Sequence, residues 1–240
     1  MSVTPNVTMT FSEEQGMLLD VARGFVRDKA PIDVIRAQLE TETGFDPALW
    51  QSMVDMGWTG IALPDSVGGA GMGVGSAVPV FESLGGGLLG TPLLSTTLAG
   101  QLIWRAAGEA AASWLTRLCG GEVGALALLD HADWGAANCG VSLGSDGCLS
   151  GRKCFVADAG VADVFVVVAN DSGEPILAIV EATALSSDAL SHNVVIDLTK
   201  RSANVDFTGV VPVDILRGER VVSALRDLSL IHISEPTRLG

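Results

Sequence analysis

Basic side chains are scarce in this sequence. Its 240 residues include 14 Lys and Arg against 28 Asp and Glu, which gives a formal net charge of −14 at pH 7. The phosphates of a nucleic acid are repelled by such a surface, so the composition predicts no nucleic-acid partner. An anionic ligand would have to be held by local basic groups or by backbone N–H groups.

Long apolar runs and a secretion leader are also lacking. No uninterrupted apolar run reaches the length of about 18 residues that a membrane-spanning helix requires. The first ten residues do not combine a basic segment with an apolar core, and a secretory signal has both. We therefore expect neither a membrane span nor export.

Cysteine and histidine are few, and they are not arranged as metal ligands. None of the four cysteines forms a Cys-x-x-Cys pair, and the three histidines are scattered. This spacing predicts neither a metal site nor a disulfide framework, and it favours reduced thiols in a cytoplasmic protein. The cysteines are Cys119, Cys139, Cys148 and Cys154.

Apolar residues and glycine are abundant, with a hydrophobic content of 48% and 29 glycines. A chain of this length has room for one or two domains. Up to about residue 120 the apolar residues recur at helical spacing. We predict helices over residues 10–28, 32–39, 47–56, 75–84, 92–107 and 109–118. Ser12-Glu13-Glu14-Gln15 reads as a capping box, and Asp46-Pro47 as an N-cap followed by proline at the first helical position. The predicted inward-facing positions include Met17, Val21, Met56, Val78 and Leu94.

The period of the pattern changes after Gly120-Gly121. Apolar runs separated by turn residues predict strands over residues 123–129, 147–156, 164–169, 176–180 and 193–196. A further strand is predicted where Ala203, Val205 and Phe207 alternate with polar residues. Ser145-Asp146-Gly147 and Asn170-Asp171-Ser172-Gly173 read as turns. The fold class is therefore α+β, a helical domain followed by a small antiparallel β-barrel or sandwich. The predicted domains are 1–120, 121–218 and a final segment, 219–240.

One stretch, residues 60–73, combines Pro64 with five glycines between two predicted helices. Proline fixes φ and glycine allows close backbone approach, so a rigid bend followed by a tight loop is expected. No Gly-Lys-Ser/Thr follows, which argues against a phosphate loop, and the glycine spacing is wrong for a dinucleotide-binding turn. A plain connector between helices remains one interpretation.

The full arrangement is more specific. Met56-Gly57-Trp58, Gly60-Ile61, Leu63-Pro64 and Gly68-Gly69-x-Gly71 together resemble the first domain of acyl-CoA dehydrogenases, where this loop lies beside the acyl-CoA site. Gly151-Arg152-Lys153-Cys154-Phe155-Val156-Ala157-Asp158 and Asp197-Leu198-Thr199-Lys200-Arg201 resemble two segments of the middle domain of the same family. The resemblance covers residues 11–216.

The resemblance implies a flavin-linked oxidoreductase of lipid metabolism, with FAD as cofactor and an acyl-CoA as substrate. It further implies an electron-transfer flavoprotein or another acceptor, and a homo- or hetero-oligomer of related subunits. In the family a carboxylate takes the α-proton while the β-hydride passes to the flavin. The cofactor-facing positions that match are Leu129, Asp130, Phe155, Val156 and Ala157.

The sequence departs from the family at both flavin-facing segments. Leu129-Asp130-His131 stands where the family has Thr-Glu-Pro, and residues 132–140 contain no Gly-Ser-Asp. Gly144-Ser145-Asp146 is a decoy, because it falls in a hairpin turn. Ala157 lacks the hydroxyl that normally bonds the flavin. Phe155 is either a stacking partner of the flavin or an aromatic of the sheet core, and His131 is interpreted as a loop side chain.

No catalytic residue is assigned, because the family draws its carboxylate from a third, helical domain. A helix beginning near Arg220 would be the first of that domain. Residues 228–238 resemble the translation of a sequencing adapter joined to the gene, with the native frame ending near Asp227. We therefore expect a truncated acyl-CoA dehydrogenase subunit that is inactive as given. A non-catalytic or half-site partner subunit and a flavin monooxygenase or oxidase are the alternatives.

The adapter hypothesis is tested by aligning the coding DNA of residues 228–238 with adapter sequences and resequencing the locus. We expect a match that begins near codon 228. An independent sequencing read that contains the same codons and continues into genomic DNA, with no adapter, would contradict the hypothesis.

Overall fold

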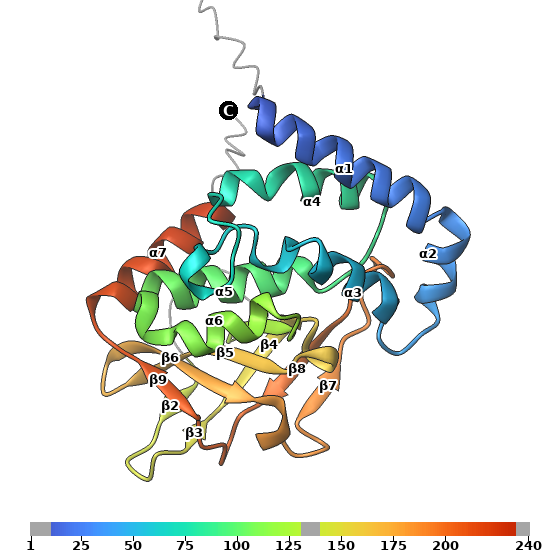
Figure 1. Cartoon of the computed structure of the whole chain (residues 1–240). Coiled ribbons are helices and arrows are strands. Elements are labelled where there is room, and N and C mark those ends of the chain that lie inside the picture. The colour runs from blue at the N-terminus through green and yellow to red at the C-terminus, as the bar shows by residue number, and fades with distance from the viewer. Residues whose placement is uncertain (1–10, 131–139, 234–240) are drawn as a thin grey trace, which may run out of the picture.

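The computed structural model describes residues 11–130 and 140–233. Helices occupy the first half and strands most of the second half, as predicted (Figure 1). In the described ranges no helix has the length and apolar character to cross a membrane. The expectations for residues 1–10 and for the end of the tail, 234–238, lie outside the described residues.

The described residues form seven α-helices and nine strands. The helices are α1 (Glu13–Lys29), α2 (Ile32–Leu39), α3 (Pro47–Asp55), α4 (Val78–Gly86), α5 (Leu93–Ala107), α6 (Ala112–Cys119) and α7 (Glu219–Ile233). The strands are β1 (Gly124–Ala127), β2 (Ser142–Leu143), β3 (Leu149–Ser150), β4 (Arg152–Ala157), β5 (Val164–Asp171), β6 (Glu174–Glu181), β7 (Leu190–His192), β8 (Ser202–Asp206) and β9 (Asp214–Leu216).

Two helices start where the local sequence signals place them. Ser12 Oγ accepts from the N–H of Gln15 at 3.2 Å, and the Gln15 side chain accepts from the N–H of Ser12 at 3.0 Å. Asp46 Oδ1 accepts from the N–H of Ala48 at 2.8 Å, with Pro47 at the first helical position. Each cap satisfies N–H groups that a helix start leaves without a partner, which is why both predictions are confirmed.

Several side chains expected to face inward are exposed instead. Met17 and Val21 are 60% and 53% exposed, whereas Ala22 and Phe25 on the same helix are buried. Helix α1 packs chiefly on α4 in the outer layer (Figure 1), so one narrow stripe of it is covered. The prediction of inward-facing positions was therefore wrong for residues at the edges of the apolar helix faces. The exposed positions are Met17, Val21, Met56, Val78 and Leu94.

Strand β5 is central to the larger sheet, whose order is β3-β2-β5-β6-β9. One edge of β5 pairs antiparallel with β6 over eight residues. Along its other edge lie β1 and then β2, both parallel to β5. The sequence predicted antiparallel pairing, but β1 and β5 are separated by more than thirty residues, which is long enough for a crossover between parallel strands.

Both faces of β5 and β6 are buried, which explains the unbroken apolar run in β5. Phe165, Val167 and Ala169 face the smaller sheet, β4-β8-β7, in one apolar cluster. Val164 and Val166 pack with α5, α6 and α7 in another. The sandwich interior and the helical layer therefore share one sheet between them.

Two predicted strands differ in the structure. Residues 193–196 form no strand. The register with β8 ends at His192, the N–H of Asn193 makes one more bond to Ser202 O, and the side chains of Val194 and Ile196 project fully into solvent. An apolar run without a partner strand does not make a strand. The segment 147–156 is divided into β3 and β4 at Gly151, which has φ of +123° and packs against the carbonyl oxygen of Gly140.

The glycine-rich loop 60–73 joins α3 to α4 and is folded back on itself. The N–H of Ala70 donates to Gly60 O at 3.0 Å, and the N–H of Gly71 to Leu63 O at 2.8 Å. Gln101 Nε2, on α5, donates to Ala62 O at 2.7 Å. The loop is thus anchored on the buried helix α5.

We predict that Gly69→Ala destabilises the protein by about 2–3 kcal/mol, as overpacking does. A Cβ at residue 69 would lie 2.1 Å from Leu63 O. Because this oxygen belongs to the backbone, it cannot move away without disturbing the loop. Urea denaturation measures the change. Gly73→Ala is the control, because its Cβ would meet nothing within 4 Å. Equal stabilities of the two variants would contradict the close packing of this loop.

Candidate functional site

The structure brings together the two segments that carry the predicted cofactor positions. Leu129 O accepts from the N–H of Cys154 at 2.6 Å, an isolated antiparallel bridge between the end of the β1 segment and β4. Leu129 and Asp130 therefore lie beside Phe155, Val156 and Ala157, although about 25 residues separate them. The predicted proximity is observed, whereas a role in cofactor binding remains a prediction.

A β-bulge turns Phe155 outward. The register between β4 and β8 shifts between Lys153 and Val156, and Phe155 has φ of +50°. Its N–H donates to Asn204 Oδ1 at 3.1 Å, and its side chain is 40% exposed. Bulges re-aim side chains in this way, often next to functional sites. The exposed ring excludes the interpretation of Phe155 as an aromatic of the sheet core.

Backbone strain is concentrated around Ala157. Phe155 and Asp158 both have positive φ, at +50° and +56°, and neither is a glycine. Such conformations cost about 1–3 kcal/mol each and persist where the surroundings impose them. Between them Val156 is buried and Ala157 is exposed. The bulge and the turn thus present an exposed face formed by Phe155 and Ala157.

The carboxylate of Asp130 points into the protein. Asp130 Oδ1 lies 2.5 Å from Lys153 Nζ, and both side chains are nearly inaccessible to solvent. Lys153 Nζ also donates to Leu128 O at 3.1 Å. Asp130 therefore fixes the buried lysine and ties the two segments together. Sequence reasoning missed this pair, although the inward register of Lys153 in β4 is a signal that a buried partner is needed.

A second carboxyl group, that of Asp158, closes the site on the helical side. Asp158 Oδ2 lies 2.5 Å from Oγ of Ser95, in the first turn of α5. Burial raises the pKa of Asp158 above its ordinary value, while the Ser95 hydrogen bond and the charge of Lys200 act in the opposite direction. Residues 95 and 158 are 63 positions apart, and no local pattern links them.

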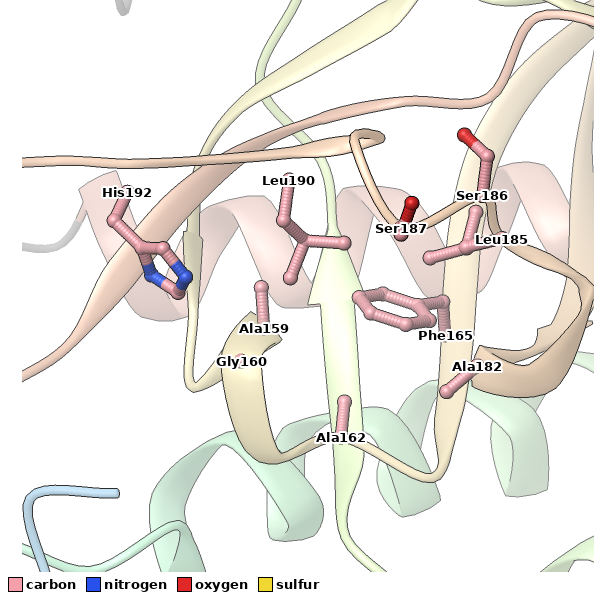
Figure 2. A pocket seen from close by; sticks show the side chains of 10 residues that line it. All are labelled: Ala159, Gly160, Ala162, Phe165, Ala182, Leu185, Ser186, Ser187, Leu190 and His192. Atoms are coloured by element: carbon pink, nitrogen blue, oxygen red, sulfur yellow. The ribbon is translucent and has the colours of Figure 1, made fainter. Parts of the chain in front are cut away.

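A cavity of about 450 Å³ opens at the end of the β-sandwich, between β5 and β7. Figure 2 shows Phe165 and Leu190 near its middle, with His192 at one end and Ser186 and Ser187 at the other. No charged side chain is among its lining residues, which suits a neutral group better than a diphosphate. The lining residues are Ala159, Gly160, Ala162, Phe165, Ala182, Leu185, Ser186, Ser187, Leu190 and His192.

The remaining candidate segments are placed as follows. Gly144-Ser145-Asp146 lies in the turn between β2 and β3, closed by the bond from the N–H of Gly144 to Cys148 O. The interpretation of this tripeptide as a hairpin turn is therefore confirmed. His131 and residues 132–139 lie outside the described residues. Within the described ranges no cluster of three potential metal ligands occurs.

The sequence resembles known proteins in its first half. The family model for the acyl-CoA dehydrogenase N-terminal domain matches residues 12–122. The chain is 39% identical over 89 residues to the acyl-CoA dehydrogenase IpdE2 of Mycolicibacterium smegmatis, which is 37% of this chain and 29% of that protein. It is 36% identical over 122 residues to IpdE2 of Mycobacterium tuberculosis, which is 50% of this chain and 38% of that protein.

Solved structures share the fold over nearly the whole chain. The Tcur3481-Tcur3483 steroid ACAD G363A variant matches with a TM-score of 0.76 and 27% identity, covering 90% of this chain and 60% of that chain. The ChsE4-ChsE5 complex from Mycobacterium tuberculosis matches with a TM-score of 0.76 and 24% identity, covering 92% and 62%. An acyl-CoA dehydrogenase from Bacillus anthracis in complex with FAD matches with a TM-score of 0.74 and 21% identity, covering 96% and 42%.

The helical half, the β half and these matches together define an α+β protein of the acyl-CoA dehydrogenase type. The chain belongs to the acyl-CoA dehydrogenase family. The matched regions amount to 29% and 38% of the lengths of the two IpdE2 proteins, and the chain covers 60% and 62% of the first two structures.

We predict that Lys153→Met costs about 3–5 kcal/mol near neutral pH, since it leaves the buried Asp130 carboxylate without its cation. The double variant Lys153→Met/Asp130→Asn should recover much of this loss, because the buried charge is gone. Urea denaturation measures both. Asp28→Ala, which breaks the exposed pair with Arg27, is the control and should change little. A single variant as stable as the wild type would contradict the buried pair.

Proposed function

We propose that the chain forms part of a flavin-linked acyl-CoA dehydrogenase subunit and supplies one wall of the flavin site. The observation that supports this most is the exposed Phe155–Ala157 face beside Leu129 and Asp130. These are the positions that the family resemblance assigns to the flavin. FAD, when bound, would accept the hydride from Cβ of an acyl-CoA. The proposed partners are an electron-transfer flavoprotein or another acceptor, and related subunits.

The exposed residues suit the flavin ring in shape. Phe155 offers an aromatic face held by the bulge and by Asn204, and Ala157 is small and exposed, so a flat ring can approach closely. Offset stacking on Phe155 would be worth about 0.5–1.5 kcal/mol beyond the buried area. Leu129 and Val156 would support this face from beneath, because Val156 is buried and Leu129 O is bonded to Cys154. We assign no catalytic role to any described residue.

The shape of this wall suits a flavin ring, but the wall offers the ring few polar contacts. Ala157 has no hydroxyl to bond the ring, and the Asp130 carboxylate is already engaged by Lys153. These two features favour a second candidate, a half-site or non-catalytic subunit that works with a flavin-binding partner. Two structural neighbours are the ChsE4-ChsE5 complex and the Tcur3481-Tcur3483 steroid ACAD, which supports the same candidate for this chain. In both candidates we expect the isolated chain to bind FAD weakly.

Purification distinguishes the two candidates. A form of the protein that also carries the family's third, helical domain is expressed alone and together with a related acyl-CoA dehydrogenase subunit, and flavin absorbance and acyl-CoA-dependent dye reduction are measured. Flavin and activity in this extended form alone would support the complete subunit. Flavin that appears only with the partner would support the half-site subunit. An absence of flavin and of acyl-CoA-dependent activity in both preparations would contradict the proposed function.

We predict that Ala157→Thr tightens FAD binding about 2- to 10-fold, because it restores one hydroxyl hydrogen bond. Phe155→Ala should weaken binding, since the stacking face is lost. Quenching of flavin fluorescence at several protein concentrations measures both. Ile196→Ala is the control, because it removes an exposed apolar side chain outside the two segments. If Ile196→Ala and Phe155→Ala have the same effect, the assignment of Phe155 to the flavin is wrong.

A further inference from the structure

Strand β8 carries neutral polar side chains next to the exposed face of β4. Ala203 and Val205 of β8 are buried in the sandwich interior. Ser202 and Asn204 alternate with them, so they point to the opposite side of the sheet, where both are half-buried. Ser202 is the direct partner of Ala157 in the antiparallel register. Directly opposed residues have their side chains on the same side, so the hydroxyl of Ser202 lies beside the methyl group of Ala157.

The side chain of Asn204 is held in one orientation by the β-bulge. Asn204 Oδ1 accepts from the N–H of Phe155 at 3.1 Å. A backbone N–H can donate only to the oxygen of the amide, so this bond fixes which way the Asn204 amide is turned. In the part of the chain that the structure describes, the N–H₂ group of Asn204 donates to no protein group. Asn204 therefore presents amide donors beside Phe155.

The side chain of Ser202 is held by Asn193. Asn193 Nδ2 donates to Ser202 Oγ at 3.2 Å, and the N–H of Asn193 donates to Ser202 O at 2.9 Å. A serine hydroxyl accepts and donates at the same time, so the bond from Asn193 leaves the Ser202 proton for another acceptor. Among the described residues, Ser202 Oγ donates that proton to no protein group.

The charge of this face indicates what kind of group the donors suit. Neither Ser202 nor Asn204 is charged, and the charged side chains at the far end of β4 and β8, Arg152 and Asp206, stand opposite each other. A phosphate prefers a cluster of cationic donors, which this pair does not provide. A neutral planar group with acceptors on its edge fits better. The ring of a flavin is such a group, because its edge carries carbonyl oxygens and ring nitrogens.

We propose that Ser202 and Asn204 bind the flavin together with the exposed face of β4. The Ser202 hydroxyl replaces the one that is absent at Ala157, and the Asn204 N–H₂ donates to a second acceptor on the edge of the ring. Strand β8 thus supplies neutral polar contacts that β4 lacks. This inference rests on the proposed function, which assigns the ring to Phe155 and Ala157, and it adds two binding residues from the neighbouring strand.

FAD binding by single variants of the whole chain tests the role of Ser202. Ser202→Ala should weaken binding about 2- to 10-fold, because one neutral hydrogen bond is lost. Ser202→Thr keeps the hydroxyl on a residue that suits a strand, so it should bind FAD as the wild type does. Ser191→Ala is the matched control, since Ser191 lies opposite Asn204 on β7, one strand further from β4, and it should change nothing. Quenching of flavin fluorescence measures all three.

The double variant Ala157→Thr/Ser202→Ala tests whether one hydroxyl replaces the other. If both serve the same acceptor, Ala157→Thr tightens FAD binding by a larger factor when residue 202 is alanine than when it is serine. Equal factors in the two backgrounds would overturn the replacement of one hydroxyl by the other.

Phe155→Ala separates a failure of this inference from a failure of the proposed function. If Phe155→Ala weakens FAD binding and Ser202→Ala does not, the inference is overturned and the flavin wall on β4 stands. If neither variant changes binding, or if the wild-type chain does not quench the flavin at all, both are overturned.

A second measurement needs no variant. In the ¹⁵N-labelled chain, the side-chain amide of Asn204 is assigned by NMR and followed as FAD is added. Its N–H₂ resonances should shift, because they gain an acceptor. The amide of Gln51, which donates to Asp55 within α3, is the control and should not shift. An unshifted Asn204 amide under conditions in which FAD shifts the backbone N–H of Phe155 would overturn the role of Asn204.

Discussion

The burial of helix α5 is the constraint on which the rest of the structure depends. Its apolar side chains pack on the outer face of β5 and on α6 and α7. At its N-terminal end, Thr96 Oγ1 accepts from the N–H of Gly124 in β1, and Ser95 meets Asp158. Further along, Gln101 holds the glycine-rich loop. Because α5 is covered on nearly every side, it fixes how the helical layer, β1 and the end of β4 lie relative to one another.

Short sequence patterns correctly predicted the features that depend only on neighbouring residues, such as the starts of helices. The capping box at Ser12 and the Asp46-Pro47 start satisfy helix ends within four residues, so the sequence pattern was sufficient. Alternation in β8 also predicted its buried residues correctly. The exposed Met17 and residues 193–196, which form no strand, show the limit, because exposure and pairing depend on which element lies opposite. The parallel pairing of β1 with β5 likewise reflects a long crossover that no short pattern contains.

The sequence predicted which two segments form the candidate site. It did not predict the contacts that their side chains make. The family resemblance of two separate segments predicted that Asp130 and Phe155 lie near each other, and the bridge between Leu129 and Cys154 brings them together. The directions of the side chains were not predictable. A bulge turns Phe155 outward, and Lys153 draws the Asp130 carboxylate inward, since a buried ammonium needs an acceptor.

We have proposed that the exposed face formed by Phe155 and Ala157 is the wall on which a flavin lies. Hydrogen–deuterium exchange of the chain, with and without a saturating concentration of FAD, reports on this face itself. We expect slower exchange in β4 and at residues 129–130, with no change at residues 182–192 around the cavity between β5 and β7. Protection confined to residues 182–192 around that cavity, or no protection in β4 when FAD is bound, would contradict it.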